Sequence, residues 1–323
     1  MLGPLNVNLA EFGVSPRNGF LPDELPLKVL SSSYYESWEC IINDLHSLLK
    51  SRSLRSQVDQ LPILSTSHLI SEQEWQRAYL ILSFFTHSYI WEAGGPSEVC
   101  LLNLLQANIL IKIQNLPPQI SIPFIDIADH LGLPPTATYA ATNLWNFTTL
   151  SPHKPTSSMS NLRALHTFTG SRDEEWFYLV SVAIEAKGAI VITEMLKAMD
   201  AVRSGNSHVV LSSLIRFGFC VREIGLLIER MDEKCSPDVF YNDIRPFLAG
   251  SKNMGVAGLP NGVFYDEGEG KGEWRKYSGG SNAQSSLIQF FDIVLGVEHS
   301  LTGGAKGSKN GFLDVSFPSI LPS

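Results

Sequence analysis

The strongest constraint on the fold is a long segment, Arg172–Arg203, because both of its ends carry helix-terminating signals. Ser171 and Glu174 form a capping-box pattern, in which a serine and a glutamate side chain satisfy free backbone N–H groups at the start of a helix. Gly205 follows the other end, and glycine commonly ends helices because it tolerates a left-handed backbone. The pattern predicts one helix over the whole segment.

Apolar residues at three- and four-residue spacing predict further helices on both sides of this segment. Two of them cover Tyr35–Leu49 and Glu72–Tyr89. Another follows Ser207, with one continuous apolar stripe made of Leu214, Phe217, Val221, Ile224 and Ile228. The segment Ser285–Val297 is apolar nearly all round, so we expect it at the centre of the fold. Alternating period-two runs are few, and the sequence therefore predicts an all-α fold.

A polar stretch from Ser151 to Ser160 interrupts the helical pattern and contains Pro152 and Pro155. Polar segments rich in proline are typical of domain boundaries. We expect a small N-terminal helical domain over residues 1–160, packed on a larger C-terminal helical bundle over residues 161–323.

The composition excludes several classes of partner. The 323 residues are 44% hydrophobic and 17% charged, with a formal net charge of −8, and no cluster of Lys and Arg suits a nucleic acid. Residues Met1–Leu27 lack the basic start and apolar core of a signal peptide. The most apolar run, Val99–Ile113, is interrupted by polar residues and is shorter than the span of about 20 residues that crosses a bilayer. We expect neither a nucleic-acid nor a membrane partner.

Cysteines and histidines show no metal-site spacing. The four cysteines lie far apart without a CxxC pair, which suits free thiols in a reducing compartment and predicts a cytoplasmic protein. The eight histidines are likewise scattered, and GxSxG, HExxH, P-loop and GxGxxG motifs are absent. The spacing of residues therefore assigns no metal ligand and no acid–base catalyst.

Two local features suit a small-molecule site. Phe177, Ser181 and Glu185 share one face of the long predicted helix, where an aromatic ring and a hydroxyl could line a dry pocket. The alternative is that Phe177 lies in the core and Ser181 bonds back to its own helix. Pro246 breaks the helical pattern next to Arg245, whose guanidinium could bind a carboxylate in bidentate fashion. Arg245 could equally be solvated or paired with a nearby acidic residue.

Two further segments combine flexible backbone with polar side chains. Gly279–Ser286 precedes the apolar helix, and glycines allow the backbone to approach a ligand closely. A flexible turn with a serine cap explains the same residues. Leu133–Asn146 begins with two prolines and places polar residues on an aromatic surface. Each segment alone is only suggestive.

The order of these segments and their residue motifs together resemble those of the indoleamine 2,3-dioxygenase family. The resemblance covers most of Ala10–Glu298. It is carried by Leu133-Pro-Pro with Tyr139-Ala, Phe177-Tyr-Leu-Val-Ser181 with Glu185, Phe240 with Arg245 and Gly250, Gly279-Gly-Ser281 with Gln284-Ser-Ser286, and Phe291-Asp-Ile-Val-Leu-Gly296.

The resemblance implies a monomeric haem enzyme that acts on an indole. Members of the family bind haem b between a small and a large helical domain, and cleave the C2–C3 bond of L-tryptophan with O₂. The product, N-formylkynurenine, enters the kynurenine pathway. By the same resemblance, the substrate pocket is lined by Tyr139, Thr142, Phe177, Ser181, Phe240 and Arg245. The cofactor would be contacted by Gly280, Ser281, Asn282 and Asp292.

Within this resemblance, each group has an expected role. Phe177 and Phe240 would pack on the flat indole, and Arg245 would grip the substrate carboxylate. Ser281 would lie near a haem propionate, and Asp292 would help to hold the haem site together. Ser181 is expected to line the pocket without transferring a proton, since haem supplies the oxygen chemistry.

Two departures from the family pattern affect this expectation. An apolar insertion lies between Ser97 and Asn115, and the likeness ends in the tail Asp314–Ser323. The family takes its proximal histidine from a later helix, and no histidine of this sequence matches it. We expect weak haem retention and an exposed apolar patch for the chain as given.

Two alternatives to tryptophan cleavage stay open. One is a non-catalytic helical protein of the same descent that binds an indole or a partner without ligating iron. The other is an enzyme that acts on a different indole, because Thr142 and Asn282 occupy positions where pocket shape could alter selectivity.

We hypothesise that one cause, an altered transcript or gene model, produced both departures. If retained intron sequence produced them, mature transcripts will lack both the insertion after Ser97 and the tail from Asp314. Sequencing the mature transcript measures this. Abundant mature message that contains both segments would contradict the hypothesis.

Overall fold

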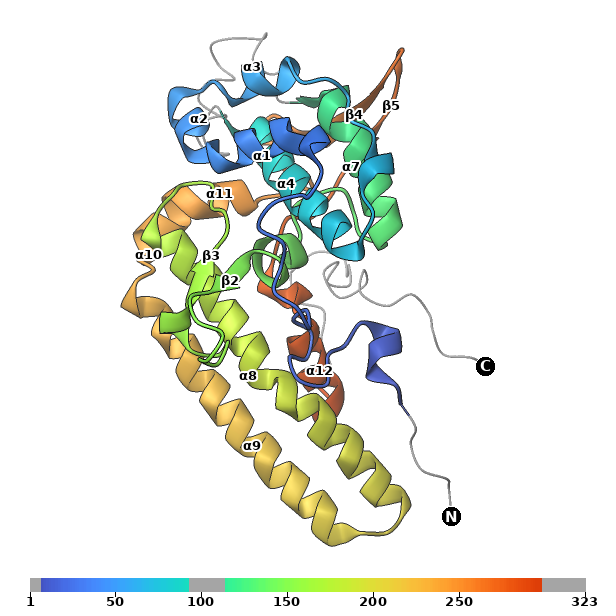
Figure 1. Cartoon of the computed structure of the whole chain (residues 1–323). Helices are drawn as coiled ribbons and strands as arrows, with labels where there is room; N and C mark the ends of the chain where they lie inside the picture. The colour runs from blue at the N-terminus through green and yellow to red at the C-terminus, as the bar shows by residue number, and fades with distance from the viewer. Residues whose placement is uncertain (1–6, 93–113, 298–323) are drawn as a thin grey trace.

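The computed structural model describes residues 7–92 and 114–297. Helices form most of it, in two groups (Figure 1). The N-terminal helices and a small sheet lie at one end, and two long antiparallel helices extend from them. The described residues do not include the tail Asp314–Ser323 or the apolar run Val99–Ile113, and they include only residue 114 of the predicted insertion between Ser97 and Asn115.

The long helix α8 (Arg172–Arg203) has the predicted bounds, and α9 (Ser207–Glu229) follows it after a short turn. Gly205 has the expected left-handed backbone, with φ of 73°. Ser171 accepts a hydrogen bond from the backbone N–H of Glu174, so half of the predicted capping box is present. The carboxylate of Glu174 instead accepts from the backbone of Phe168 and Thr169.

The N-terminal group is built around α4 (Glu72–Trp91), which is buried along most of its length. Its start carries a complete capping box between Ser71 and Glu74, which the sequence analysis did not single out. The other helices of this group are α1 (Glu36–Asn43), α2 (Leu45–Ser51), α3 (Leu54–Asp59) and α7 (Pro118–Leu131). The helix predicted over Tyr35–Leu49 is thus split in two at Asp44.

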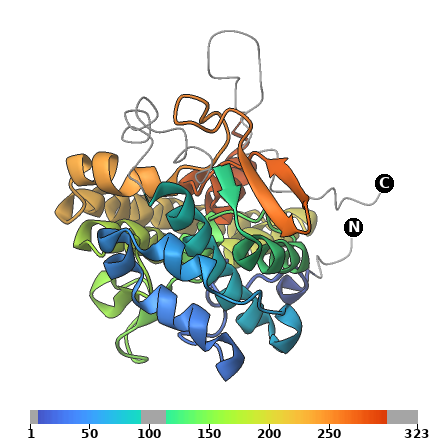
Figure 2. The ribbon, with the colours of Figure 1, turned by 90° about the horizontal axis from the view of Figure 1, so that it is seen from above.

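Two small sheets accompany the helices, and the all-α prediction is confirmed. Strand β4 (Val263–Gly268) pairs in parallel with β1 (Asn115–Leu116) and antiparallel with β5 (Lys271–Arg275). This sheet lies beside α7 (Figure 2). A second sheet joins β2 (Phe147–Thr149) and β3 (Leu162–Ala164).

The chain passes between the two groups more than once. Val263 and Tyr265 of β4 belong to the same hydrophobic cluster as α4, whereas Leu21 packs in the cluster of α8. The boundary near residue 160 stays a prediction. The remaining short elements are η1 (Leu9–Phe12), η2 (Ser33–Tyr35), η3 (Thr66–His68), η4 (Ala140–Leu144), η5 (Met159–Asn161), η6 (Arg230–Glu233), α10 (Pro237–Val239), η7 (Phe240–Ile244), α11 (Arg245–Leu248), η8 (Asn282–Gln284) and α12 (Ser286–Leu295).

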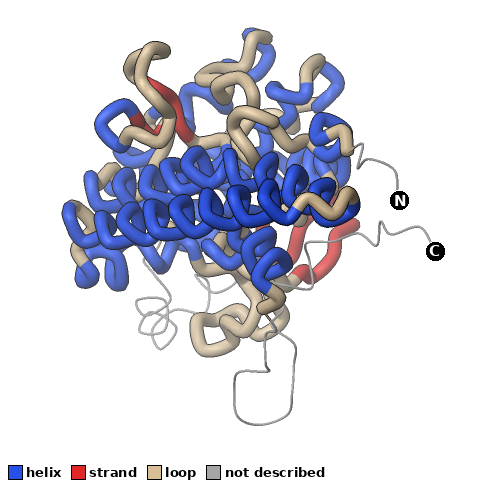
Figure 3. The backbone as a smooth tube through the Cα atoms, turned by 90° about the horizontal axis from the view of Figure 1, so that it is seen from below, coloured by secondary structure: helices blue, strands red, loops and turns tan. Residues whose placement is uncertain are grey.

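Helices α8 and α9 lie side by side (Figure 3). The predicted apolar stripe of α9 is only half covered: Phe217 and Ile224 are buried, but Leu214, Val221 and Ile228 are exposed. The buried residues of α9 are Ser213, Phe217, Cys220 and Ile224. The apolar face of α9 is therefore wider than the surface that one neighbouring helix can cover.

Helix α12 is not central, so that expectation was wrong. Leu287 and Phe291 are buried against α8 and α9, whereas Ile293 is 66% and Leu295 is 58% exposed. A helix that is apolar all round needs neighbours on every side, and the described residues cover one side only. Exposed apolar side chains therefore lie on both α9 and α12.

A buried ion pair joins α4 to α1 within the N-terminal group. The guanidinium of Arg77 donates to Glu39 at 2.6 and 3.1 Å, and to His166 Nε2 at 2.8 Å. Burial, and then the nearby Arg77 charge, lower the pKa of His166 to about 3. The imidazole is therefore neutral and accepts a hydrogen bond from the guanidinium. The described helices include none that is long and apolar enough to cross a membrane.

Replacing Arg77 tests the importance of this pair. Arg77→Ala leaves the Glu39 carboxylate buried without a counter-charge, which should cost about 3–5 kcal/mol of unfolding free energy. Arg216→Ala is the control, since its pair with Glu194 has an arginine side chain that is 61% exposed. That change should cost under about 1 kcal/mol. Urea unfolding measures both, and equal losses would contradict this account.

Candidate functional site

The predicted site residues lie on four parts of the chain. Tyr139 and Thr142 belong to the segment that forms the π-helical turn η4, and Phe177 and Ser181 lie on α8. Phe240 begins a second π-helical turn, η7, and Arg245 directly follows it. The last group, Gly280, Ser281, Asn282 and Asp292, lies on η8, its preceding loop and α12.

Three of these residues come together around the middle of α8. The Ser181 hydroxyl lies 3.4 Å from the side-chain oxygen of Asn282. The backbone N–H of Tyr139 donates to Gln284 at 3.0 Å, which attaches the η4 segment to the loop of Asn282. Tyr139 and Ser181 are almost fully buried, whereas Asn282 is exposed. The structure thus places a phenol, a hydroxyl and an amide next to one another.

Glu185 links these parts, and the sequence analysis gave it no role. Its Oε1 accepts hydrogen bonds from the Tyr139 phenol at 2.9 Å and from the Ser285 hydroxyl at 2.5 Å. Burial raises the pKa of Glu185 to about 7, against the lowering effect of the two hydroxyls. Its position four residues after Ser181, on the same helix face, was the signal available in the sequence.

Thr142 and Ser281 are satisfied within their own segments. The Thr142 hydroxyl donates to the backbone oxygen of Thr138 at 3.2 Å. Ser281 caps η8, accepting a hydrogen bond from the backbone N–H of Ala283 at 3.2 Å. Asp292 is half-buried on α12. The cofactor contacts expected of Ser281 and Asp292 stay predictions.

Phe177 and Phe240 form an aromatic pair, with ring centroids 4.7 Å apart and a 43° angle between planes. Both rings are half-buried at the edge of the α8 cluster. Arg245 begins α11 directly before Pro246, where the backbone changes from π-helical to α-helical geometry without a break. The Arg245 side chain is exposed and lies over the ring of Tyr241, 5.2 Å from its centroid. Its carboxylate-binding role stays a prediction.

The described histidines do not fit the demand of haem iron for an axial ligand. Both ring nitrogens of His87 are engaged, Nδ1 with the Phe247 oxygen at 2.6 Å and Nε2 with Thr136 at 2.9 Å. His166 binds Arg77 and the backbone of Ile42. The other described histidines are exposed: His46, His68, His130, His153 and His208. Among the described residues, none of these histidine side chains bonds to Tyr139, Ser181 or Asn282.

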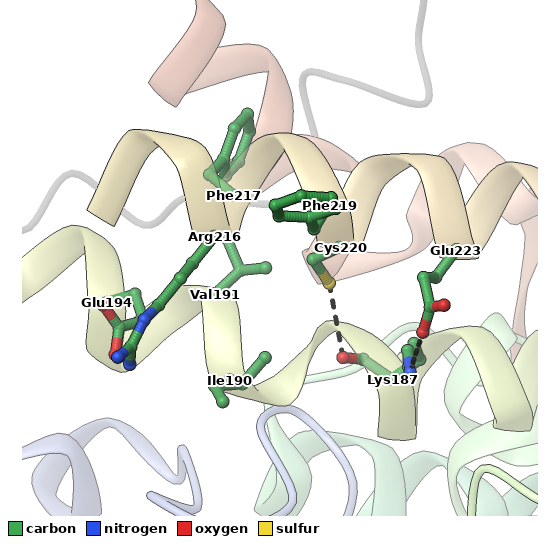
Figure 4. Close-up of a pocket in the computed structure, with 9 residues that line it drawn as sticks. All are labelled: Lys187, Ile190, Val191, Glu194, Arg216, Phe217, Phe219, Cys220 and Glu223. Carbon is green, nitrogen blue, oxygen red and sulfur yellow. Dashed lines mark hydrogen bonds and ion pairs between the residues drawn. The ribbon is translucent and has the colours of Figure 1, made fainter. Parts of the chain in front are cut away.

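An open groove of about 390 Å³ lies between α8 and α9, apart from these residues (Figure 4). Ion pairs border it, Lys187 with Glu223 and Arg216 with Glu194. Its floor is apolar, and it contains none of the predicted site residues. It marks the uncovered edge of the helix pair.

A close backbone crossing sets the start of the Asn282 loop. A Cβ atom on Gly279 would lie 1.8 Å from the Leu248 oxygen, and one on Gly250 would lie 2.3 Å from the Gly279 nitrogen. The Trp91 indole N–H of α4 donates to the backbone oxygen of Ala249 at 2.9 Å. The loop is therefore anchored to the N-terminal group at one end and to α8 at the other.

Two adjacent glycines test this anchor. Gly279→Ala forces the crossing apart and should lower the unfolding free energy by about 3 kcal/mol. At Gly280 an added Cβ meets its nearest atom at 3.6 Å, so Gly280→Ala should change stability by under about 1 kcal/mol. Thermal unfolding of both variants measures the difference. A tolerated Gly279→Ala would show that the two backbones do not touch.

Comparison with known proteins identifies the family. Residues 8–316 match the profile of the indoleamine 2,3-dioxygenase family. The chain is 40% identical over 306 residues to an indoleamine 2,3-dioxygenase of Aspergillus candidus, covering 93% of this chain and 72% of the relative. It is 41% identical over 323 residues to that of Saccharomyces cerevisiae, covering 97% and 66%. A 6-hydroxytryptophan 2,3-dioxygenase of Fusarium equiseti is 37% identical over 296 residues, covering 92% and 69%.

Coverage of the relatives is partial, since the chain spans between 63% and 72% of the length of the fungal relatives that it matches. The family match itself extends over nearly the whole chain, including α8 and the loop of Asn282. This chain belongs to the indoleamine 2,3-dioxygenase family.

Proposed function

We propose that this chain forms the substrate-facing part of a haem-dependent dioxygenase that opens the indole ring of L-tryptophan. The reaction would break the C2–C3 bond with O₂ and give N-formylkynurenine, the entry to the kynurenine pathway. The observation that carries the proposal is the meeting of Tyr139, Ser181 and Asn282, which come from three separate segments. The iron ligand that this activity requires is not among the described histidines.

The aromatic pair would hold the indole. Phe177 and Phe240 offer half-buried ring faces, which bind a flat apolar ring by packing. Arg245 is exposed, and its planar guanidinium would reach the substrate carboxylate. Tyr139 and Ser181 would exclude water from the indole edge. In this proposal the side chains bind and orient the substrate, and bound haem supplies the oxygen chemistry.

A substituted indole is the second candidate substrate. The Fusarium equiseti relative is named for 6-hydroxytryptophan. Asn282 is exposed at the site and Thr142 lies in the wall segment, so both could favour a ring substituent that forms hydrogen bonds. Competition between L-tryptophan and 6-hydroxytryptophan for the purified protein separates the two substrates.

Haem binding is the test of the enzyme class. Because no described histidine fits the iron, the purified and reduced chain should retain added haem only weakly, and the haem that it does retain should give a Soret band that shifts with carbon monoxide and responds to L-tryptophan. Retained L-tryptophan binding without any haem would contradict the dioxygenase proposal. That outcome would favour a non-catalytic indole-binding protein of the same family.

Replacing Phe177 tests the substrate site without relying on iron. Phe177→Ala removes one ring of the pair and should weaken L-tryptophan binding about tenfold, or about 1.4 kcal/mol. Phe219→Ala is the matched control, because that ring is 63% exposed on α9, apart from the site. Isothermal titration measures both affinities. Equal affinities for the two variants would exclude the aromatic pair as the indole site.

A further inference from the structure

We propose that Glu185 is a positioning residue, which holds the Tyr139 segment and the Asn282 loop together against α8. One carboxyl oxygen makes both connections. Oε1 accepts from the Tyr139 phenol at 2.9 Å and from the Ser285 hydroxyl at 2.5 Å, and all three groups are buried. Removing this one oxygen would release two segments at once.

Ser285 makes the second connection structurally important. Its hydroxyl accepts the backbone N–H of Ile288 and so caps the start of α12, while donating to Glu185. The same serine ends the loop that carries Asn282. Glu185 therefore fixes both the end of the loop and the start of the following helix.

The second oxygen of Glu185 has no hydrogen-bond partner, although it is buried. Burial dominates the pKa of Glu185, and among the described residues the other groups that affect it are the Ser285 hydroxyl and the titratable Tyr139 phenol. No charged group of the described residues, on α8, α12 or the Tyr139 segment, contributes to this pKa. Ionisation would therefore leave a bare, buried oxygen, which favours the neutral acid.

The sign of the pH dependence follows from this. The pKa of Glu185 is raised from 4.5 to about 7 in the folded protein. The stability contributed by the neutral acid is complete below pH 4.5 and is lost as pH rises through 7. The attachment of the Tyr139 segment and the Asn282 loop to α8 should weaken over the same pH range.

Any effect of Glu185 on substrate binding rests on the proposed function. The structural connection that Glu185 makes between the two segments does not. Tyr139 and Asn282 are proposed to face the indole; Glu185 bonds directly to Tyr139, reaches the Asn282 loop through Ser285, and is assigned no substrate contact itself. It acts through them, and amide hydrogen exchange observes the hold directly.

The first experiment compares Glu185→Ala with Glu174→Gln by hydrogen-exchange mass spectrometry of the full chain. Glu174 is the matched control: it is a fully buried glutamate of α8 that also accepts from a tyrosine, Tyr178, at 2.8 Å. Glu185→Ala should speed exchange at least about tenfold in peptides spanning residues 137–144 and 281–288. Glu174→Gln should leave these two peptides at wild-type rates. Unchanged exchange in Glu185→Ala would overturn the proposal.

The second experiment uses pH and stays informative if Glu185→Ala does not fold. Glu185→Gln keeps an oxygen that accepts both hydroxyls and cannot ionise. After correction for intrinsic exchange, wild-type protection in the two peptides should fall severalfold between pH 6 and 8.5. Protection in Glu185→Gln should stay level. Equal slopes in the two proteins would overturn the role of Glu185.

The outcomes also separate this inference from the proposed function. Loss of protection in Glu185→Ala, in a protein that binds neither haem nor L-tryptophan, would support the positioning role and reject the dioxygenase. Haem and L-tryptophan binding with unaltered protection would reject the positioning role alone.

Discussion

The burial of two carboxyl groups on one face of α8 determines how the rest of the chain surrounds this helix. A buried carboxyl needs hydrogen-bond donors, and the two glutamates take them from different places, Glu174 from the residues just before the helix and Glu185 from distant segments. Glu174 takes them from the backbone of Phe168 and Thr169, and thereby fixes the entry to the helix. Glu185 takes them from Tyr139 and Ser285, and thereby brings the candidate site together.

The balance of burial differs between the two groups of helices. Helix α4 is covered along most of its length, whereas the described residues cover α9 and α12 on one side only. Exposed apolar surface of this kind is typical of faces that bind another element. The described residues thus form a well-packed N-terminal group and a partly covered helix pair, with the candidate site near their junction.

Local sequence signals predicted where the helices begin and end better than they predicted which helix faces are buried. The bounds of α8 followed from Ser171 and Gly205, because caps act through neighbouring backbone groups. The burial of α9 and α12 depends on which other elements pack against them. An apolar stripe in the sequence does not identify those elements. For the site, the sequence indicated Phe177, Ser181 and the glycine loop. The donors to Glu185 lie 46 and 100 residues away along the chain, so spacing could not reveal them.

The most direct test of the account is the fate of oxygen atoms when the haem-loaded chain meets L-tryptophan under ¹⁸O₂. Mass spectrometry of the product should show N-formylkynurenine with both new oxygen atoms labelled, as a dioxygenase requires. A protein that binds haem and L-tryptophan but yields no doubly labelled product would contradict the account.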